Sequence, residues 1–349
     1  MSSSSYNLAN NLVKISTALF LYLLSTNSLA DDLFDMLKRM ADADQNQNYQ
    51  GTFILRKSDN LSTLLVTHGV DNKGVWESLE ALNGESRKVF RFNDRVISVF
   101  PDREIVTIRH TSNKKSLHPQ LPDNIDQLEQ YYSMKRLADD RIANHQTLVV
   151  DLLPKDQFRY GYRYWVDKNT GMLLRCDLVD ENKTVVEQMM FTSLDYLSEV
   201  PAQNFELQQF EQFKQQLQDE PEVKVSQAEG AGWKVGHLPK GFMLTQSTMR
   251  YSQPSPVVDP SINGTGQSAA TLSDTSSPDL LHLVYSDGLA SVSIFVEINQ
   301  GVEKHLQGEA SMGAVNAFGH ALDGYFATVV GEVPAKTVQL MAQSIVKVP

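Results

Sequence analysis

The chain has 349 residues, enough for two domains of about 150 residues each, and its content of 41% hydrophobic and 21% charged residues is typical of globular proteins. A formal net charge of −11 argues against a nucleic-acid partner, because phosphate binding needs clustered Lys and Arg. The same charge argues against simple adsorption to an anionic membrane surface. The single cysteine, Cys176, cannot form an internal disulfide, and we interpret it as a small core residue in a strand.

The first thirty residues have the pattern of a secretory signal peptide. Lys14 precedes an apolar run over 15–24, and Ser28-Leu29-Ala30 supplies small residues ahead of a cleavage site. The run is shorter than the roughly 20 residues that a spanning helix needs. We therefore expect 1–30 to be removed near Ala30-Asp31 and the mature chain to work outside the cytoplasm. A buried N-terminal helix is the alternative interpretation.

Residues 31–218 are predicted to form a large domain. Asp31 and Asp32 suit the start of a helix, because the helix dipole favours anions there. The apolar side of this helix is Leu33, Phe34, Leu37, Met40 and Ala41.

From Tyr49 to Tyr196 the sequence reads as short strands separated by turns. Turn residues at Asn93-Asp94, at Pro101-Asp102 and over 167–171 leave no room for crossover helices, which predicts an antiparallel meander. The strand-like runs are YQGTFILRK, STLLVTH, RKVFRF, RVISVF, EIVTIRH, TLVVDLL, RYGYRYWV, MLLRCDLV and TVVEQMMF.

Two further helices are predicted in this domain. Asp123 and Asn124 can cap the first, whose apolar side is Ile125, Leu128 and Tyr132. The second covers 202–217, with Leu207, Phe210, Phe213 and Leu217 on one face. The expected large domain is a long, curved antiparallel sheet with helices against one face, so the fold class is mainly β with α (α+β).

A polar linker over 219–231 is predicted to precede a small C-terminal α+β domain, 232–349. Residues 252–278 are rich in Ser, Pro and Gly and poor in aliphatic side chains, which is typical of a disordered loop. Ser286-Asp287-Gly288 and Asp323-Gly324 each indicate a hairpin. Pro334 is expected at the first position of a last helix with Val338, Met341, Ala342 and Ile345 on its core side.

No pattern of catalytic or metal-ligating residues is convincing. The chain has no G-x-S-x-G, H-E-x-x-H or C-x-x-C motif, and its eight histidines are scattered singly. We therefore predict that the protein is not an enzyme and uses no metal or cofactor. An envelope hydrolase is a hypothesis without residue support.

The sequence feature that does point to a binding function is a set of alternating aromatic and aliphatic residues. Tyr160, Tyr162 and Tyr164 alternate with Arg159, Gly161 and Arg163, and Leu174, Cys176 and Leu178 alternate in the next run. A curved sheet with helices along one side leaves a concave face that is either filled or left as a cavity. Packing under the helices and a cavity for acyl chains both remain open at this point.

Two parts of the chain resemble the RseB/MucB family of periplasmic regulators of the sigma-E (AlgU) response. They are 164–196, and in the C-terminal part 283–297 with 323–345. The W-x-D-x-x-T-G-x-x-L-R element from Trp165 to Arg175 also occurs in lipoprotein carriers of the LolA/LolB type.

This resemblance implies a half-open, LolA-like β-barrel with helices in its concave side, and a smaller C-terminal domain. It implies binding to the periplasmic region of a membrane anti-sigma factor of the RseA/MucA type, shielding it from the site-1 protease. Lipopolysaccharide or another acylated envelope component would then trigger release. A periplasmic lipoprotein or lipid carrier of the LolA/LolB type is the alternative function, and the sequence leaves homo-oligomerisation open.

Candidate site residues follow from strand alternation and residue type. For the partner surface we select aromatic residues expected to be exposed near the small-domain hairpins, with one arginine: Arg250, Tyr251, Tyr285, Phe318 and Tyr325. For Phe318, packing within the small domain is an interpretation at least as strong. The candidates for acyl contact in the large domain are Phe53, Leu55, Ile97, Val99, Tyr162, Tyr164, Leu174, Met189 and Phe191.

Overall fold

The computed structural model describes residues 33–110, 128–199, 212–217, 232–250, 280–298 and 307–348, apart from 34, 44 and 73. The predicted signal peptide 1–30, the linker 219–231 and the loop 252–278 lie outside these residues. The chain forms two compact units. Unit 1 is Met1–Val106, Thr111–Lys155 and Gly161–Gln215, and unit 2 is Thr107–His110, Asp156–Tyr160 and Gln216–Pro349.

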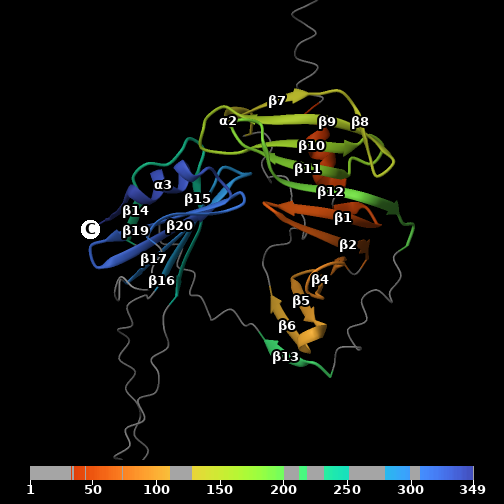
Figure 1. The fold of residues 1–349 in the computed structure, drawn as a ribbon, viewed down its shortest axis with the longest axis horizontal. Helices are drawn as coiled ribbons and strands as arrows, with labels where there is room; N and C mark the ends of the chain where they lie inside the picture. Colours follow the sequence, from red (N-terminus) through yellow and green to blue (C-terminus); the bar gives the residue numbers. More distant parts are fainter. Residues whose placement is uncertain are drawn as a thin grey trace, which may run out of the picture. The chain divides into compact units, whose positions relative to one another are not determined.

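Unit 1 is built on a 13-stranded sheet (Figure 1). The ends of two of its strands, 107–110 of β6 and 216–217 of β13, are assigned to unit 2 although they belong to this sheet. The strand order is β13-β6-β5-β4-β3-β2-β1-β12-β11-β10-β9-β7, and β8 pairs with β9. The order does not close on itself among the described strands, and neighbours with a described register are antiparallel. The strands are β1 (Tyr49–Lys57), β2 (Asn60–Asp71), β3 (Gly74–Ala81), β4 (Lys88–Phe92), β5 (Arg95–Phe100), β6 (Ile105–His110), β7 (Tyr132–Arg136), β8 (Asp140–Ile142), β9 (His145–Pro154), β10 (Gly161–Asp167), β11 (Leu173–Val179), β12 (Val185–Tyr196) and β13 (Lys214–Leu217).

The predicted meander is confirmed, since every run named from the sequence coincides with a strand. Strand β3 was not among those runs, although it lies between β2 and β4 in the sheet. Asn93 adopts φ 52 in the β4–β5 turn, and the short 3-10 helix η1 (Pro101–Arg103) joins β5 to β6. The mainly antiparallel fold class expected from the sequence is therefore correct.

The helices of unit 1 differ in part from the prediction. Residues 35–43 are helical, and Leu37 and Met40 on this segment are buried, as expected. Helix α2 (Leu128–Tyr131) has four described residues, and Tyr132 already belongs to β7. The prediction of a helix to Leu217 is wrong at its C-terminal end, because β13 pairs with β6 and Lys214 donates its N–H to the Glu104 carbonyl at 2.9 Å.

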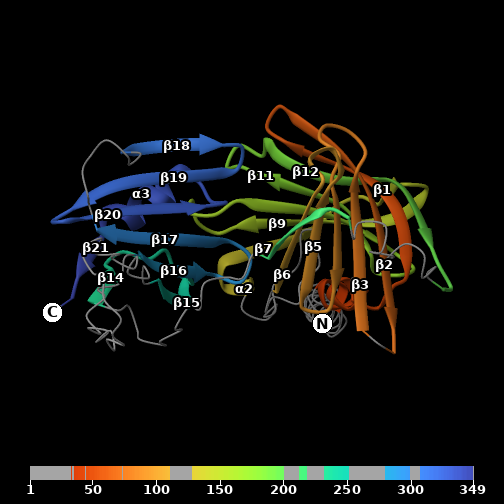
Figure 2. The same ribbon diagram turned by 90° about the horizontal axis from the view of Figure 1, so that it is seen from below.

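Unit 2 contains a six-stranded sheet with the order β15-β16-β17-β20-β19-β18 and a helix, α3, against it (Figure 2). Both predicted hairpins are confirmed, β16–β17 and β19–β20. Pro334 caps α3 rather than occupying its first turn, and Ile345 begins β21. The elements are β14 (Trp233–Val235), β15 (Met243–Arg250), β16 (Leu280–Ser286), β17 (Ser291–Ile298), β18 (Gly308–Met312), β19 (Val315–Leu322), β20 (Tyr325–Gly331), α3 (Ala335–Gln343) and β21 (Ile345–Lys347).

Alternation along β16, β17 and β20 builds the core of unit 2 against α3. Leu283, Ile294 and Val329 are paired across the three strands and are at most 1% exposed. Val338 and Met341 of α3 are fully buried in the same cluster. Within the described part of the chain, no helix combines the length and apolar character that a membrane span requires.

Candidate functional site

One face of the large sheet gathers seven of the nine acyl-contact candidates. Tyr164 lies opposite Cys176, Cys176 opposite Met189, and Met189 opposite Leu55, so the register places them side by side. The ring centroids of Phe53 and Phe191 are 5.5 Å apart. The register places six of the seven on this apolar face: Phe53, Leu55, Tyr162, Tyr164, Met189 and Phe191. The seventh, Leu174, lies at the register shift of β11 and is assigned to the face by its spacing of two from Cys176.

The other two candidates, Ile97 and Val99, lie on the opposite face. Ile97 pairs with Phe90, Phe90 with Ser78, and Ser78 with Thr67. Directly paired residues point to the same side of an antiparallel sheet, so the register separates this row from Phe53, which pairs with Leu64. Ile97 and Val99 are buried in their own right. These two candidates therefore lie on the face opposite to Phe53, and acyl contact stays a prediction for all nine.

Most of the apolar face is tightly packed. Leu174, Phe191, Met189, Tyr164 and Phe53 are between 0% and 4% exposed. Burial raises the pKa of the Tyr164 hydroxyl well above its ordinary value. Leu55 and Tyr162 are half-buried, so a ligand approaching this face would meet these two side chains first.

The described residues of unit 1 also form an open pocket of about 330 Å³. None of the nine acyl-contact candidates lines it. It lies beside β7 and α2, and its lining combines apolar groups with a carboxylate and an ammonium group: Leu33, Glu129, Tyr132, Ser133, Met134 and Lys155.

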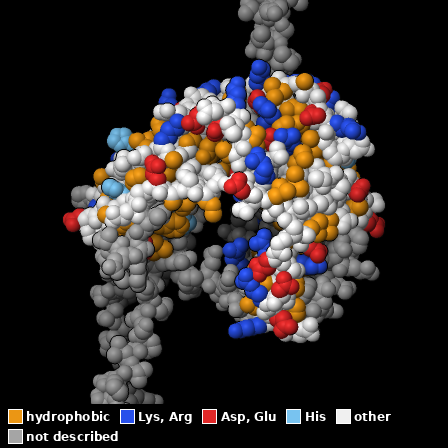
Figure 3. Space-filling view, in the orientation of Figure 1, with side chains coloured by type: hydrophobic (Ala, Val, Ile, Leu, Met, Phe, Trp, Pro, Cys, Tyr) orange, Lys and Arg blue, Asp and Glu red, His pale blue; other side chains and the backbone are white. Residues whose placement is uncertain are grey.

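The opposite face of β9 to β12 is polar, as the alternation of arginines with tyrosines in 159–165 indicates. Arg163 binds Asp151 through two contacts of 2.5 and 3.1 Å. Arg175 binds Asp177 at 2.9 and 2.6 Å and lies 4.0 Å above the centre of the Trp165 ring. Figure 3 shows Lys and Arg interspersed with Asp and Glu over the β7–β12 part of unit 1. In β9 to β11 the two faces therefore differ: one carries Tyr164 and Cys176, and the other carries these Arg–Asp pairs beside Trp165.

The W-x-D-x-x-T-G element forms a structural turn rather than a reactive centre. The Asp167 carboxylate accepts hydrogen bonds from the Thr170 N–H at 3.3 Å and the Tyr196 hydroxyl at 3.1 Å, and lies 3.0 Å from His145 Nδ1. His145 and Tyr196 lie 22 residues before and 29 residues after Asp167, and no local sequence pattern connects them with this turn. Among the described residues, no group of three or more His, Cys, Asp and Glu side chains could hold a metal ion.

Gly171 joins this turn to the N-terminal helix. Its φ is +82°, and a Cβ there would lie 3.0 Å from the backbone oxygen of Arg39. We expect Gly171→Ala to lower the free energy of unfolding of unit 1 by about 1–3 kcal/mol, because strain and crowding act together. Gly84→Ala is the matched control, since Gly84 has φ +75° and nothing within 4 Å. Urea unfolding of both variants measures the difference, and equal midpoints would show that the contact with Arg39 does not matter.

The partner-surface candidates are less exposed than predicted. Tyr285 is only 6% exposed and belongs to the core of unit 2, so the expectation that it is an exposed anchor is wrong. The reason is strand alternation, which pairs Tyr285 with buried Val292. Phe318 and Tyr325 are partly buried against the same core. Arg250 ends β15, and Tyr251 lies outside the described residues.

Tyr325 is nevertheless accessible enough to contact polar groups. Its hydroxyl accepts a hydrogen bond from Lys347 Nζ at 3.1 Å, and its ring lies edge-on to Trp233 at 5.0 Å. Of the five candidates, Tyr325 and Phe318 are those whose described side chains keep both an apolar surface and some exposure.

Two protein-family models match this chain. The MucB/RseB N-terminal domain model matches residues 32–209, and the MucB/RseB C-terminal domain model matches residues 227–346. The chain belongs to the MucB/RseB family. The family resemblance expected from 164–196 and from the C-terminal runs is thereby confirmed.

Members of the MucB/RseB family resemble this chain over nearly its full length. The sigma factor AlgU regulatory protein MucB of Pseudomonas aeruginosa is 30% identical, covering 90% of this chain and 91% of that protein. The sigma-E factor regulatory protein RseB of Haemophilus influenzae is 24% identical over 93% of this chain and 94% of its own length. A solved complex of Pseudomonas aeruginosa MucA and MucB matches with a TM-score of 0.65 and 27% identity, covering 91% of this chain and 99% of the solved one.

Proposed function

We propose that the chain is a periplasmic regulator that binds the periplasmic region of a membrane anti-sigma factor of the RseA/MucA type. By covering that region it protects the anti-sigma factor from site-1 proteolysis, and the sigma-E response stays off. The observation that carries the proposal is the match to MucB in complex with MucA, which extends over both units of this chain. A carrier of the LolA/LolB type would need only the large unit, so the match across the small unit favours the regulator.

Such a regulator acts by occupancy and needs no catalytic group, in keeping with the absence of catalytic motifs from the sequence. Release by lipopolysaccharide or another acylated ligand is the second part of the proposal. A ligand shifts a binding equilibrium only by its difference in affinity for the two conformations. A coupling of about 1–3 kcal/mol changes partner affinity by 5- to 150-fold.

Protection can be measured with purified components. The mature protein is mixed with an RseA/MucA-type periplasmic fragment and the site-1 protease, and fragment cleavage is followed over time. We expect cleavage to slow roughly tenfold when the protein exceeds its dissociation constant tenfold, because only free fragment is cut. An unrelated acidic protein at the same concentration controls for non-specific effects. Equal rates with both proteins, despite binding of the fragment, would refute protection.

The acyl-binding proposal can be tested with two neighbouring residues of β1. Leu55 points to the apolar face and Ile54 to the opposite face, and both are half-buried. We expect Leu55→Gln to raise about tenfold the lipopolysaccharide concentration that releases the fragment, since burying a leucine contributes about 1.5–3 kcal/mol.

The matched variant Ile54→Gln should leave that concentration within about twofold of the unmodified protein, because Ile54 has the same degree of burial but lies on the face opposite to the proposed acyl contact. Fragment binding in the absence of lipopolysaccharide reports whether either variant has damaged the fold. Equal shifts for the two variants would place the acyl chain elsewhere than on the apolar face.

A further inference from the structure

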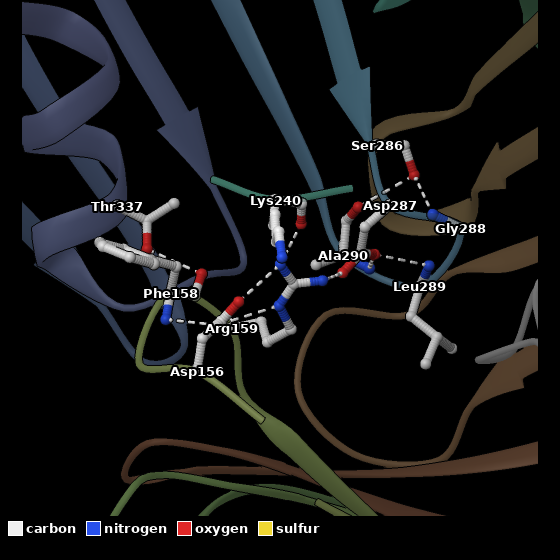
Figure 4. A network of polar contacts seen from close by, with 10 residues as sticks. All are labelled: Asp156, Phe158, Arg159, Lys240, Ser286, Asp287, Gly288, Leu289, Ala290 and Thr337. Atoms are coloured by element: carbon white, nitrogen blue, oxygen red, sulfur yellow. Dashed lines mark hydrogen bonds and ion pairs between the residues drawn. The ribbon is translucent and has the colours of Figure 1, made fainter. Parts of the chain in front are cut away.

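Five residues between β9 and β10 belong to unit 2 although both strands belong to the large sheet. These residues, Asp156–Tyr160, form the docking segment. Figure 4 shows it beside the β16–β17 turn and α3, two elements that lie more than a hundred residues further along the chain. The fold thus inserts a loop from the first part of the sequence into the C-terminal unit.

Arg159 is the centre of the docking segment. Its side chain is 0% exposed. The guanidinium binds Asp156 at 3.1 and 2.9 Å, donates to the Lys240 carbonyl at 2.5 Å, and forms an ion pair with Asp287. The ring centre of Phe242 lies 5.2 Å from the guanidinium carbon. The planar guanidinium of arginine has several N–H donors in a fixed geometry, so it can bind these three acceptors at once. The single ammonium group of a lysine would not reproduce these contacts.

The Asp287 carboxylate is held in place independently of the docking segment. Its Oδ1 accepts the N–H groups of Leu289 at 2.9 Å and Ala290 at 2.8 Å, which shapes the β16–β17 turn. Its Oδ2 faces Arg159, and the carboxylate is 0% exposed. The acceptor for the guanidinium is therefore pre-oriented by its own hairpin.

Two buried side chains of unit 2 hold the rest of the docking segment. Thr337 of α3 donates its hydroxyl to the Phe158 carbonyl at 2.7 Å, and Asn316 of β19 donates to the Tyr160 hydroxyl at 3.1 Å. Thr337 and Asn316 are 0% and 6% exposed. None of residues 156–160 is part of the hydrophobic core cluster of unit 2. The described contacts of the segment with unit 2 are therefore mainly polar, together with the Phe242 ring beside Arg159.

We propose that unit 2 carries a receptor site for this arginine-bearing segment, and that the segment exchanges between docked and released states. The receptor site consists of Asp287, Phe242, Asn316, Thr337 and the Lys240 carbonyl. The Asp287 carboxylate sets the balance, because a buried guanidinium requires opposite charge and Asp287 is the described carboxylate that pairs with Arg159 from outside the segment, whereas Asp156 moves with it. In the released state, residues 156–160 leave the receptor site while the core cluster of unit 2, which contains none of them, stays in place. This inference does not depend on the proposed function.

Hydrogen–deuterium exchange of the full mature chain, resolved by peptide, tests the proposal. In Asp287→Asn, amides of 157–160 should exchange about tenfold faster or more, while amides of β17 and β20 keep their rates, since local opening exposes only the segment that opens. Asp323→Asn is the matched control. It makes the same change in the exposed β19–β20 turn of the same sheet, and it should leave 157–160 unaffected.

Thr337→Val provides a second variant if Asp287→Asn does not fold. It removes only the hydroxyl donated to Phe158 and should accelerate 157–160 by about threefold to tenfold, the effect of one lost hydrogen bond. Unchanged exchange of 157–160 in the variants would overturn the proposal. Equal acceleration throughout unit 2 would also overturn it, because the segment would then open only when the whole unit unfolds.

Discussion

Phe191→Ala is expected to lower the free energy of unfolding of unit 1 by about 3–5 kcal/mol, the usual cost of emptying a buried phenylalanine site. Phe191 is 1% exposed on β12. Its ring lies 5.5 Å from Phe53 and 6.2 Å from Tyr49, measured between ring centres. Removal therefore deprives two other aromatic side chains of their packing partner.

The space that Phe191 fills cannot be closed by a small shift of the backbone. A Cβ at Gly51 would lie 2.9 Å from the Phe191 ring and 2.6 Å from the Ser193 carbonyl oxygen, so the ring covers the glycine directly. Because β1 and β12 are held by their ladder of hydrogen bonds, the strands cannot collapse into the cavity. This is why we place the cost at the upper part of the range for core substitutions.

Phe92→Ala is the matched control for Phe191→Ala. Phe92 is also a strand phenylalanine of unit 1, but it is 46% exposed. We expect its replacement to cost less than about 1 kcal/mol. Urea unfolding, monitored by exchange of β1 and β12 peptides, measures both variants. Similar losses for the two variants would mean that the apolar face is not the core of unit 1.

Strand alternation predicted the apolar face well in one half of the large sheet. Between β10 and β11 the register is regular from Gly161 to Trp165, and the paired residues Tyr164 and Cys176 are both buried; the register shifts after Trp165. Relating β5 to β1 requires the register of four successive strand pairs. The sequence does not contain that register, so it could not show that Ile97 and Val99 lie on the face opposite to Phe53.

Segments whose structure depends on distant partners were predicted least well. Local periodicity favours a helix over 202–217, whereas 214–217 form a strand because β6 offers a free edge. Strand β3 carries Glu77 and Glu80 among its apolar residues and so lacks the composition of a strand. Glu77 is buried at 1% exposure, a position that only the folded sheet provides.

The contacts of the docking segment also depend on residues that are distant in the sequence, so local patterns could not predict them. Arg159 continues the alternation of Arg163 in the sequence, yet the chain leaves the sheet before β10 begins at Gly161. Arg159 is buried against Asp287, 128 residues away. No spacing rule within one segment could have paired them.

Met341→Ala is expected to destabilise unit 2 by about 2–5 kcal/mol, the range for a fully buried methionine. Met341 is 0% exposed on α3 and packs in the core cluster of this unit. Helix α3 has only nine residues, too few to be stable alone, so its stability comes from packing of its apolar side. Loss of the Met341 side chain thus weakens the attachment of the helix as well as the core.

Met312→Ala is the matched control for Met341→Ala, because it replaces the same residue type in the same unit at an exposed position. Met312 is at the end of β18 and is 78% exposed, so its replacement should change stability by less than about 0.5 kcal/mol. Exchange of α3 and β20 peptides in urea reports on unit 2 directly, which avoids treating a two-unit chain as a single transition. If Met341→Ala also left these peptides unchanged, α3 would be held by something other than its apolar side, and Thr337 with its bond to Phe158 would be the next group to replace.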